Sequence, residues 1–351
     1  MPTSGTVGQT FFNVATVMEH AFRRCRLDSS KITAEQTQIA RNNLFLYLTN
    51  LGNRGVNLWT LERQLVGLIP NLPTYPLAVG TIDVLEANYK TIYHASGGWA
   101  FASEGIADNA FDTSIETWCT QTLPNGDVTY QFPLDVVITH VGIMAHGDAT
   151  LDLVFEFSTN GTVWQPSLSP GPADYADRSW RYFAIPAPRL AEWYRVRETG
   201  GGVLDLRHVA FGSAPNDTPM SRMNRNNYFS LPNKSSTGSR PLQWWYNRKR
   251  TQPEMVLWPV PNTAFDLVEA VTHRHVQDPG ALTDEVEVPI RWFEAVVANL
   301  AWRLGLEIPE VDMELRKDLA ALAKVFEPDA EGEERDLSES QITPDISAYT
   351  R

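Results

Sequence analysis

The sequence offers few residues whose types and spacing suit catalysis. His273 and His275 are two residues apart, so a strand would point both imidazoles to one face, as two metal ligands require. No third ligand is spaced to join them, and ordinary strand histidines are the favoured interpretation. Asp108 and Asp112 are an acid pair of the kind that glycoside hydrolases use. None of the motifs of nucleophile elbows, zinc proteases, phosphate-binding loops or dinucleotide sites is present. We therefore expect that the protein is not an enzyme.

A basic segment is the first candidate for a binding surface. From Pro219 to Pro253 the chain has seven Arg and Lys residues and no acidic residue, a net charge of +7. Aromatic residues are interleaved with the residues of a candidate contact surface: Arg240, Arg248, Lys249 and Arg250. This composition is typical of a nucleic-acid platform. The alternatives are a protein partner, such as the acidic surface of a neighbouring copy, and strand edges whose charges face only solvent.

An acidic segment forms the C-terminal tail. Residues 327–351 carry eight acidic residues against Arg335 and Arg351, a net charge of −6. Because the segment is low in large apolar residues, we expect it to be disordered until it meets a partner. Its scattered apolar residues are the candidates for that contact: Leu337, Ile342, Ile346 and Tyr349. The net charge of the whole chain, −13, argues against a general nucleic-acid binder.

Length and composition exclude further classes of protein. No apolar run approaches the roughly 18 residues that cross a bilayer, and the N-terminus lacks the pattern of a signal peptide. We therefore expect a protein made in a cytosol, without a membrane partner. Cys25 and Cys119 fall in different expected domains, and no spacing suits a disulfide framework or a zinc site. A chain of 351 residues is long enough for two domains.

Both ends of the chain have helical periodicity. Residues 10–26 repeat apolar side chains at intervals of three and four, and a second helix is expected to begin at Thr33, with Gln36 at the capping-box position. Near the other end, two more stretches with apolar stripes predict helices, at 289–304 and 310–326. Between these helices and the middle of the chain the sequence predicts short strands, at 74–77, 81–89, 242–247, 255–258 and 265–274.

The middle of the chain predicts a β-sandwich. Short alternating runs bounded by Gly, Pro, Asn or Asp occur at 128–132, 136–145, 152–158, 180–185, 193–198 and 204–211. The order helices, strands, sandwich, strands, helices indicates an inserted domain, because the two flanking halves must meet to bury their apolar faces. We therefore expect an α+β multidomain protein. A helical host domain with a small antiparallel sheet (1–93 and 216–326) is interrupted by an all-β jelly roll or sandwich (95–214) and followed by the acidic tail (327–351).

The middle segment resembles the discoidin, or coagulation-factor type C, family of β-sandwich binding modules. The likeness is carried by Asn109–Trp118, by Phe155–Trp164, and by Trp180-Arg-Tyr with Tyr194-Arg-Val. The resemblance implies binding of sugars or lipid headgroups through loops at one end, and a calcium ion near Asp112 and Thr117. This chain has Thr113 where the family has Gly, and Arg207-His208 where the last strand usually has an acid. Calcium needs several oxygen ligands, so the loss of one weakens the expectation of calcium. We expect no other cofactor.

The flanking segments resemble the head-to-tail adaptor, or connector, proteins of short-tailed bacteriophages. The likeness is carried by stretches on both sides of the insertion: Leu58–Gln64, Tyr75-Pro-Leu, Gly80–Ala87, Tyr228–Lys234, Gly238–Pro241, Trp245–Arg248 and Leu257–Pro261. It implies a ring of 12 copies that docks on the portal, extends the DNA channel and carries tail nozzle or tail fibre proteins. The four apolar residues of the acidic tail would then bind the portal.

The expected function is therefore that of a structural protein in the neck of a phage virion, assembled in the cytoplasm of the host bacterium. DNA would pass through the ring without sequence-specific binding, and the negative charge of the chain suits a channel wall that does not retain phosphate. The alternative is a carbohydrate-binding module on an α/β scaffold. A third interpretation is a hydrolase of unknown type.

Overall fold

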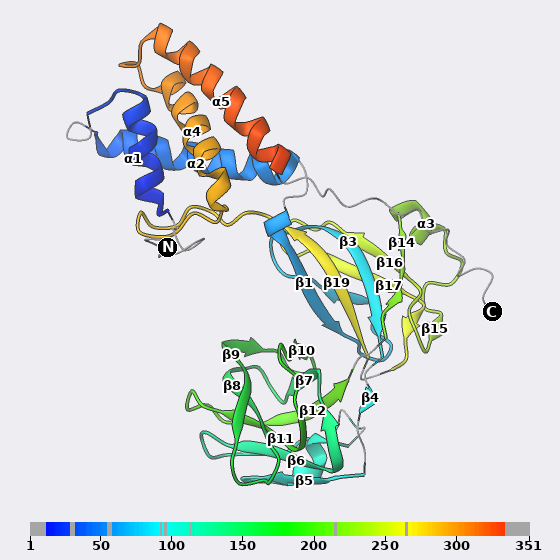
Figure 1. Cartoon of the computed structure of the whole chain (residues 1–351). Coiled ribbons are helices and arrows are strands. Elements are labelled where there is room, and N and C mark those ends of the chain that lie inside the picture. The colour runs from blue at the N-terminus through cyan, green and yellow to red at the C-terminus, as the bar shows by residue number, and fades with distance from the viewer. Residues whose placement is uncertain are drawn as a thin grey trace, which may run out of the picture. The chain divides into compact units, whose positions relative to one another are not determined.

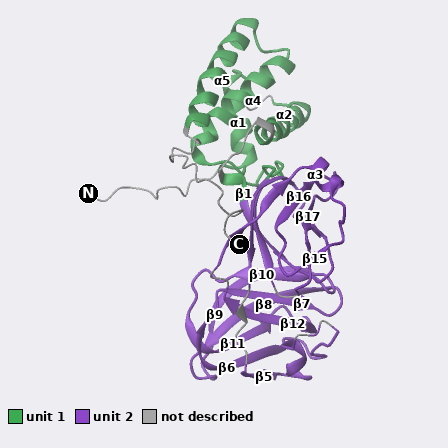
Figure 2. Ribbon diagram, turned by 90° about the vertical axis from the view of Figure 1, so that its right-hand side faces the viewer, with its two compact units in different colours: residues 1–61, 274–351 green, residues 62–273 purple. Residues whose placement is uncertain are grey.

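The computed structural model describes residues 12–28, 32–54, 58–91, 93–94, 97–112, 114, 116–213, 216–263 and 266–333. The chain divides into two compact units (Figure 2). The helical unit combines residues 1–61 with residues 274–351, and the β unit comprises residues 62–273. Segments from both ends of the chain thus build one unit, while the predicted host strands lie in the same unit as the sandwich.

The helical unit contains α1 (Val14–Arg24), α2 (Ala34–Arg54), α4 (Phe293–Glu307) and α5 (Met313–Glu333) (Figure 1). Asn13 caps α1 by accepting a hydrogen bond from the backbone N–H of Thr16 at 2.7 Å. The predicted capping box begins α2, since the Thr33 hydroxyl accepts from the Gln36 N–H and the Gln36 side chain accepts from the Thr33 N–H. Helix α5 continues past residue 326, where the predicted helix ends, and through Pro328 to Glu333, so the first residues of the expected disordered tail are helical; Ala330 is buried in the core of the unit.

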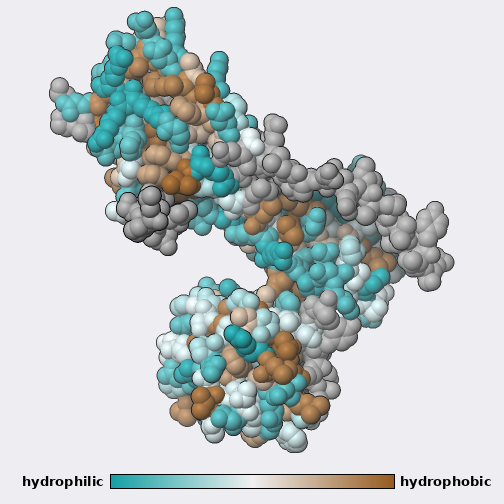
Figure 3. All heavy atoms as spheres, in the orientation of Figure 1, coloured by the Kyte–Doolittle hydropathy of each residue, from teal (hydrophilic) through white to brown (hydrophobic). Residues whose placement is uncertain are grey.

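Several large apolar side chains of the helical unit remain exposed, and Figure 3 shows apolar patches among the charged residues of its visible face. On α2, Leu44 and Leu48 are buried, whereas Phe45 and Leu46 are 40% and 53% exposed. The other exposed apolar residues of these helices are Leu306, Met313, Leu322 and Val325. The helical unit therefore buries one apolar face of α2 and leaves Phe45 and Leu46 exposed to solvent.

Among the described residues of the β unit, ten strands lie outside the sandwich; we call them the host strands. One sheet has the order β1-β19-β3-β13, a second has the order β14-β16-β17-β2, and β15 pairs with β18. Their bounds are β1 Leu61–Gly67, β2 Thr74–Pro76, β3 Thr81–Lys90, β13 Thr218–Pro219, β14 Ser221–Met223, β15 Thr237–Gly238, β16 Gln243–Asn247, β17 Glu254–Trp258, β18 Val260–Pro261 and β19 Leu267–Arg274. A short helix, α3 (Arg225–Ser230), follows β14. A shared core that includes Trp244 and Met255 holds the host strands together.

The sandwich consists of a five-stranded sheet, β5-β6-β11-β8-β9, and a four-stranded sheet, β10-β7-β12-β4. Its strands are β4 Tyr93–His94, β5 Trp99–Ala102, β6 Asp127–Val137, β7 His140–Ala145, β8 Ala149–Ser158, β9 Gln165–Tyr175, β10 Trp180–Ala184, β11 Leu190–Glu198 and β12 Leu206–Ser213. Side chains from both sheets, among them Phe132, Ile143 and Phe155, form its core. The expected β-sandwich is therefore present.

The two ends of the insertion leave and rejoin one host sheet side by side. Strand β13 pairs antiparallel with the end of β3, with Thr218 opposite Tyr89. The buried Lys90 amine makes ion pairs with Asp217 at 2.6 Å and with Glu269 of β19 at 2.7 Å. This ladder and these ion pairs fix both ends of the insertion to the same edge of the sheet.

The sandwich also packs directly against host strand β1. Trp180 and Tyr182 of β10 form a buried cluster with Met144, Ala210 and Leu267. Gly67, the last residue of β1, lies so close that a Cβ atom there would be 2.3 Å from the Trp180 Cβ. Glycine is therefore required at this contact because it has no side chain.

Candidate functional site

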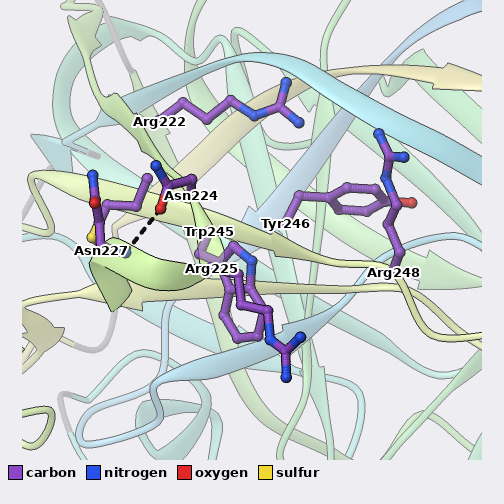
Figure 4. A pocket seen from close by; sticks show the side chains of 8 residues that line it. Arg222, Asn224, Arg225, Asn227, Trp245, Tyr246 and Arg248 are labelled. Atoms are coloured by element: carbon purple, nitrogen blue, oxygen red, sulfur yellow. Dashed lines mark hydrogen bonds between the residues drawn. The ribbon is translucent and has the colours of Figure 1, made fainter. Parts of the chain in front are cut away.

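A pocket of about 340 Å³ opens between β14, α3 and the end of β16. It is lined by three arginines, Arg222, Arg225 and Arg248, together with Asn224, Asn227 and Trp245 (Figure 4). Figure 4 shows the guanidinium groups of Arg222 and Arg248 on the side of Tyr246, and Arg225 extending past Trp245. The volume falls in the range of small-ligand pockets, roughly 300–1,000 Å³.

The strand pairing explains why these arginines meet. Strand β14 runs parallel to β16, with Met223 opposite Trp245. Asn224 then caps α3 by accepting from the Asn227 N–H at 2.8 Å, and this turn places Arg225 at the start of the helix. Arg248 follows directly after β16. Arg222 and Arg225, which are three residues apart, thus share one pocket with Arg248, which lies more than twenty residues further along the chain.

One carboxylate borders the arginines of the pocket. Arg222 donates two hydrogen bonds to Asp83, at 2.7 and 3.2 Å, and Arg248 approaches the same carboxylate at 3.5 Å. Among the residues that the structure describes, Arg225 has no acidic partner. The pocket therefore has three guanidinium groups and one bordering carboxylate, which only Arg222 and Arg248 approach, and it is cationic. The Tyr246 hydroxyl donates to the Thr81 carbonyl at 2.7 Å, and burial raises its pKa, so it stays neutral.

An aromatic group lies beside the cationic pocket. Trp245 stacks on Tyr228 with ring centroids 5.0 Å apart, and Phe229 contacts Trp245 edge-on at 5.7 Å. The Arg225 guanidinium lies 5.5 Å from the centre of the Phe229 ring, which is 56% exposed. An accessible ring, that of Phe229, therefore lies beside one of the guanidinium groups that line the pocket.

The predicted basic surface is only partly assembled. Of its four residues, Arg248 lines the pocket, and Lys249 is paired with Glu254 at 2.6 Å. Arg240 and Arg250 are exposed and do not line the pocket. The contact surface prediction omitted Arg222 and Arg225, although both lie in the acid-free segment, because nothing local to either residue indicates the parallel pairing of β14 with β16.

Asp112 and Thr117, the residues that match the calcium positions of the discoidin family, lie next to each other. The Thr117 hydroxyl donates to one Asp112 oxygen at 2.6 Å, and the Ser114 N–H donates to the other at 2.9 Å. Both carboxylate oxygens of Asp112 thus accept hydrogen bonds from residues of the same loop. Within the described ranges no group of three or more His, Cys, Asp or Glu residues is arranged to hold a metal ion.

Arg207, at the position of the family's acid, makes a different contact. Its Nε donates to Asp177 at 2.9 Å, and its guanidinium lies 5.3 Å from the centre of the Trp118 ring. The other side of this cluster is a stack of Trp118 on His146, whose Nδ1 is 2.8 Å from Asp205. The Arg207 hydrogen bond lowers the pKa of Asp177. At the position where the family usually has an acid, Arg207 thus contacts the Asp177 carboxylate and the Trp118 ring.

The remaining candidate residues do not form a site. His273 is buried in β19, whereas His275 lies beyond the end of that strand and is exposed. The two imidazoles are therefore not a pair on one strand face, as the metal interpretation requires. The candidate portal-binding residues Leu337, Ile342, Ile346 and Tyr349 lie outside the described residues.

The outer face of the five-stranded sheet carries exposed aromatic residues that the sequence did not single out. Trp99 of β5 and Trp193 of β11 both pair with Gln131 of β6, so they share one face. Phe101 stacks on Trp193 with centroids 5.6 Å apart, and Trp99 is 56% exposed. On the same face the Arg195 guanidinium lies 4.1 Å from the centre of the Trp164 ring.

No known protein-family model matches the chain, and no curated protein matches it. None of the helices in the described ranges is long and apolar enough to span a membrane.

Solved structures that are similar to part of this chain include two carbohydrate-binding modules and an F5/8 type C domain. One is a pectin-binding carbohydrate-binding module, with 16% identity over 35% of this chain and 94% of the module, and a TM-score of 0.30. Another is a module from Clostridium perfringens in complex with GalNAc-β-1,3-galactose, with 13% identity over 35% of this chain and 100% of the module, and a TM-score of 0.31. A third is an F5/8 type C domain of a Bacteroides fragilis protein, with 14% identity over 36% of this chain and 97% of the domain, and a TM-score of 0.32.

Proposed function

We propose that the chain is a structural protein of a tailed-phage virion, which assembles with copies of itself into a ring between portal and tail. The observation that carries the proposal is the exposure of two large apolar side chains of α2. Phe45 and Leu46 are exposed, whereas Leu44 and Leu48 enter the core. Large apolar and aromatic side chains are what subunit contacts bury, so these two residues suit a contact with a neighbouring copy.

The energy available from such a contact is appreciable. Burying one Leu or Phe side chain stabilises an association by about 1.5–3 kcal/mol. Leu322 and Val325 of α5 add further exposed apolar surface to the helical unit. In a closed ring every copy makes this contact on both sides, so its contribution is repeated around the ring.

The partners follow from the resemblance of the flanking segments to connector proteins. In this proposal the acidic tail binds the portal, tail nozzle or tail fibre proteins dock on the ring, and duplex DNA passes through it. The inserted sandwich lies on the outer side of the ring, because the narrow lumen of the ring would not have room for it. Assembly takes place in the cytoplasm of the host bacterium, and the protein catalyses no reaction.

The test is the mass of the purified full-length protein, alone and mixed with the portal protein of the same virus. We expect a ring of many copies, 12 in this proposal, and we expect Leu46→Glu to reduce it to single copies while the fold is kept. Val79→Glu is the matched control, because Val79 is exposed in a turn outside the helical unit. A protein that stays a single copy at every concentration, with and without portal, would refute the proposal.

A second candidate function, carbohydrate binding by the sandwich, is favoured by the exposed aromatic face of the five-stranded sheet. Trp99 and Phe101 offer flat apolar rings to solvent, and the apolar face of a sugar can stack on such rings. A glycan array probed with the full chain tests this function. Trp99→Ala should abolish any sugar signal, and Leu134→Ala, at an exposed position of β6, should not. The absence of glycan binding would remove this candidate.

A further inference from the structure

The cationic pocket has hydrogen-bond donors that the chain does not use. A guanidinium group has five N–H donors in a planar fork that matches phosphate oxygens. Arg222 donates to both oxygens of Asp83 and to the Val84 carbonyl, whereas Arg248 only approaches Asp83 at 3.5 Å, so Arg248 keeps most of its donors available and Arg222 keeps fewer. Arg225, which has no acidic partner among the described residues, adds a guanidinium group whose N–H donors are not used by an acid. The pocket is therefore built to receive an anion with several oxygen atoms.

The neighbouring ring determines which anion fits. Phe229 is held by Trp245 and Tyr228, yet more than half of its surface is exposed. An exposed ring beside an arginine is the arrangement on which unstacked bases lie in single-strand binders, where each base also brings one backbone phosphate. An acidic peptide would use the arginines, but it would gain nothing from the ring.

We propose that this pocket binds single-stranded nucleic acid, with backbone phosphates on Arg222, Arg225 and Arg248 and a base against Phe229. Duplex DNA keeps its bases stacked inside the helix, so it can offer only phosphates to the pocket. The net charge of −13 disfavours any larger electrostatic footprint. The site is therefore local and selective for single strands. This inference does not rest on ring assembly, and it leaves duplex DNA free to pass.

The experiment measures fluorescence anisotropy of a labelled oligothymidylate of about 15 nucleotides with the full-length protein. Three phosphate contacts predict that log affinity falls with log salt with a slope of about −2, so binding weakens about 20-fold between about 50 and 200 mM salt. Arg225→Gln should weaken binding about tenfold and reduce the slope by about 0.7. Phe229→Leu should weaken binding about tenfold without changing the slope, because it removes stacking and no charge.

Arg23→Gln is the matched control, because it also removes one exposed arginine, from α1 of the helical unit. It should change neither the affinity nor the slope. The thermal unfolding of each variant must match that of the parent, which separates loss of the site from loss of the fold.

Three results would overturn the proposal. Equal affinity for a duplex of the same length would show that the ring contributes nothing. Displacement of the oligonucleotide by polyglutamate at an equal charge concentration would identify an acidic protein partner instead. An effect of Arg23→Gln as large as that of Arg225→Gln would show that only the overall charge matters. Each of these measurements is independent of the particle mass that tests the ring.

Discussion

The substitution Gly67→Ala tests how closely the sandwich packs on the host strands. A Cβ atom at this position would lie 2.3 Å from the Trp180 Cβ and 2.9 Å from the Tyr182 Cε2. Non-bonded carbon atoms sit at about 3.5–4.0 Å. The Trp180 Cβ is fixed to its own backbone, so no change of rotamer relieves the clash. Strand β10 or β1 must therefore move by about 1.5 Å.

The energetic cost follows from the cluster at this contact. Overpacking of a core costs about 1–3 kcal/mol, and a backbone shift here also separates Trp180 from Met144 and Leu267. We expect a loss of about 3 kcal/mol, which lowers the melting temperature of the β unit by about 6–12 °C. Differential scanning calorimetry measures the shift, and the fluorescence of the tryptophans reports whether the cluster has opened.

Gly332→Ala is the control for this prediction. Gly332 lies in α5, and nothing lies within 4 Å of a Cβ atom there. Alanine should leave the stability unchanged or raise it by up to about 1 kcal/mol, since glycine is unfavourable inside a helix. The packing argument fails if Gly67→Ala melts within about 1 °C of the parent.

Three further predictions concern buried ionisable groups. Lys90→Met leaves the partly buried Glu269, whose side chain is 12% exposed, without its nearer cation, so the free energy of unfolding should fall by about 3 kcal/mol in urea titrations. Burial, and then the Lys90 cation, lower the pKa of His140 below 6.5. The stability that this group contributes is present above pH 6.5 and lost as the pH falls through its lower folded pKa, so His140→Gln should lose less stability than the parent on acidification. Burial raises the pKa of Cys25 to about 11 and also raises that of Cys119, so both thiols should react with a thiol reagent only after denaturation.

Local patterns in the sequence predicted most individual elements. The capping box at Thr33 and the apolar stripe of residues 10–26 gave the first two helices, because caps and amphipathic periodicity act within a few residues. The alternating runs of the sandwich likewise became strands. One expected strand, 136–145, is two: β6 ends at Val137 and β7 begins at His140.

Strand β9 was missed for a physical reason. Gln165–Tyr175 contains Pro166, Pro170 and Pro172, and proline cannot donate to a β ladder. The strand is tolerated because it forms the edge of its sheet, where it pairs only with β8. A local pattern cannot indicate that a segment will occupy an edge. The same limit applies to the parallel pairing of β14 with β16, which brings Arg222 to Arg248.

The charge pattern of the sequence predicted that this surface is positive, but it did not predict which charged residues meet there. The acid-free segment from Pro219 to Pro253 contains the three arginines of the pocket, yet the acid that borders them, Asp83, comes from β3. The sequence alone therefore overstates the positive charge of the surface and cannot tell which cations stay available. Arg225 is the decisive one, because its place at the start of α3 keeps it away from Asp83 and beside Phe229.

The two proposals reside in different units of the chain, and this permits a crossed test. Leu46 belongs to α2 of the helical unit, whereas Arg225 belongs to the β unit. Distant substitutions without shared partners have additive effects. Leu46→Glu should therefore reduce the particle mass and leave the intrinsic affinity of each copy for single strands unchanged. Arg225→Gln should weaken that affinity and leave the particle mass unchanged. If Leu46→Glu also abolished oligonucleotide binding, the pocket would depend on a neighbouring copy, and the single-chain description of the site would be wrong.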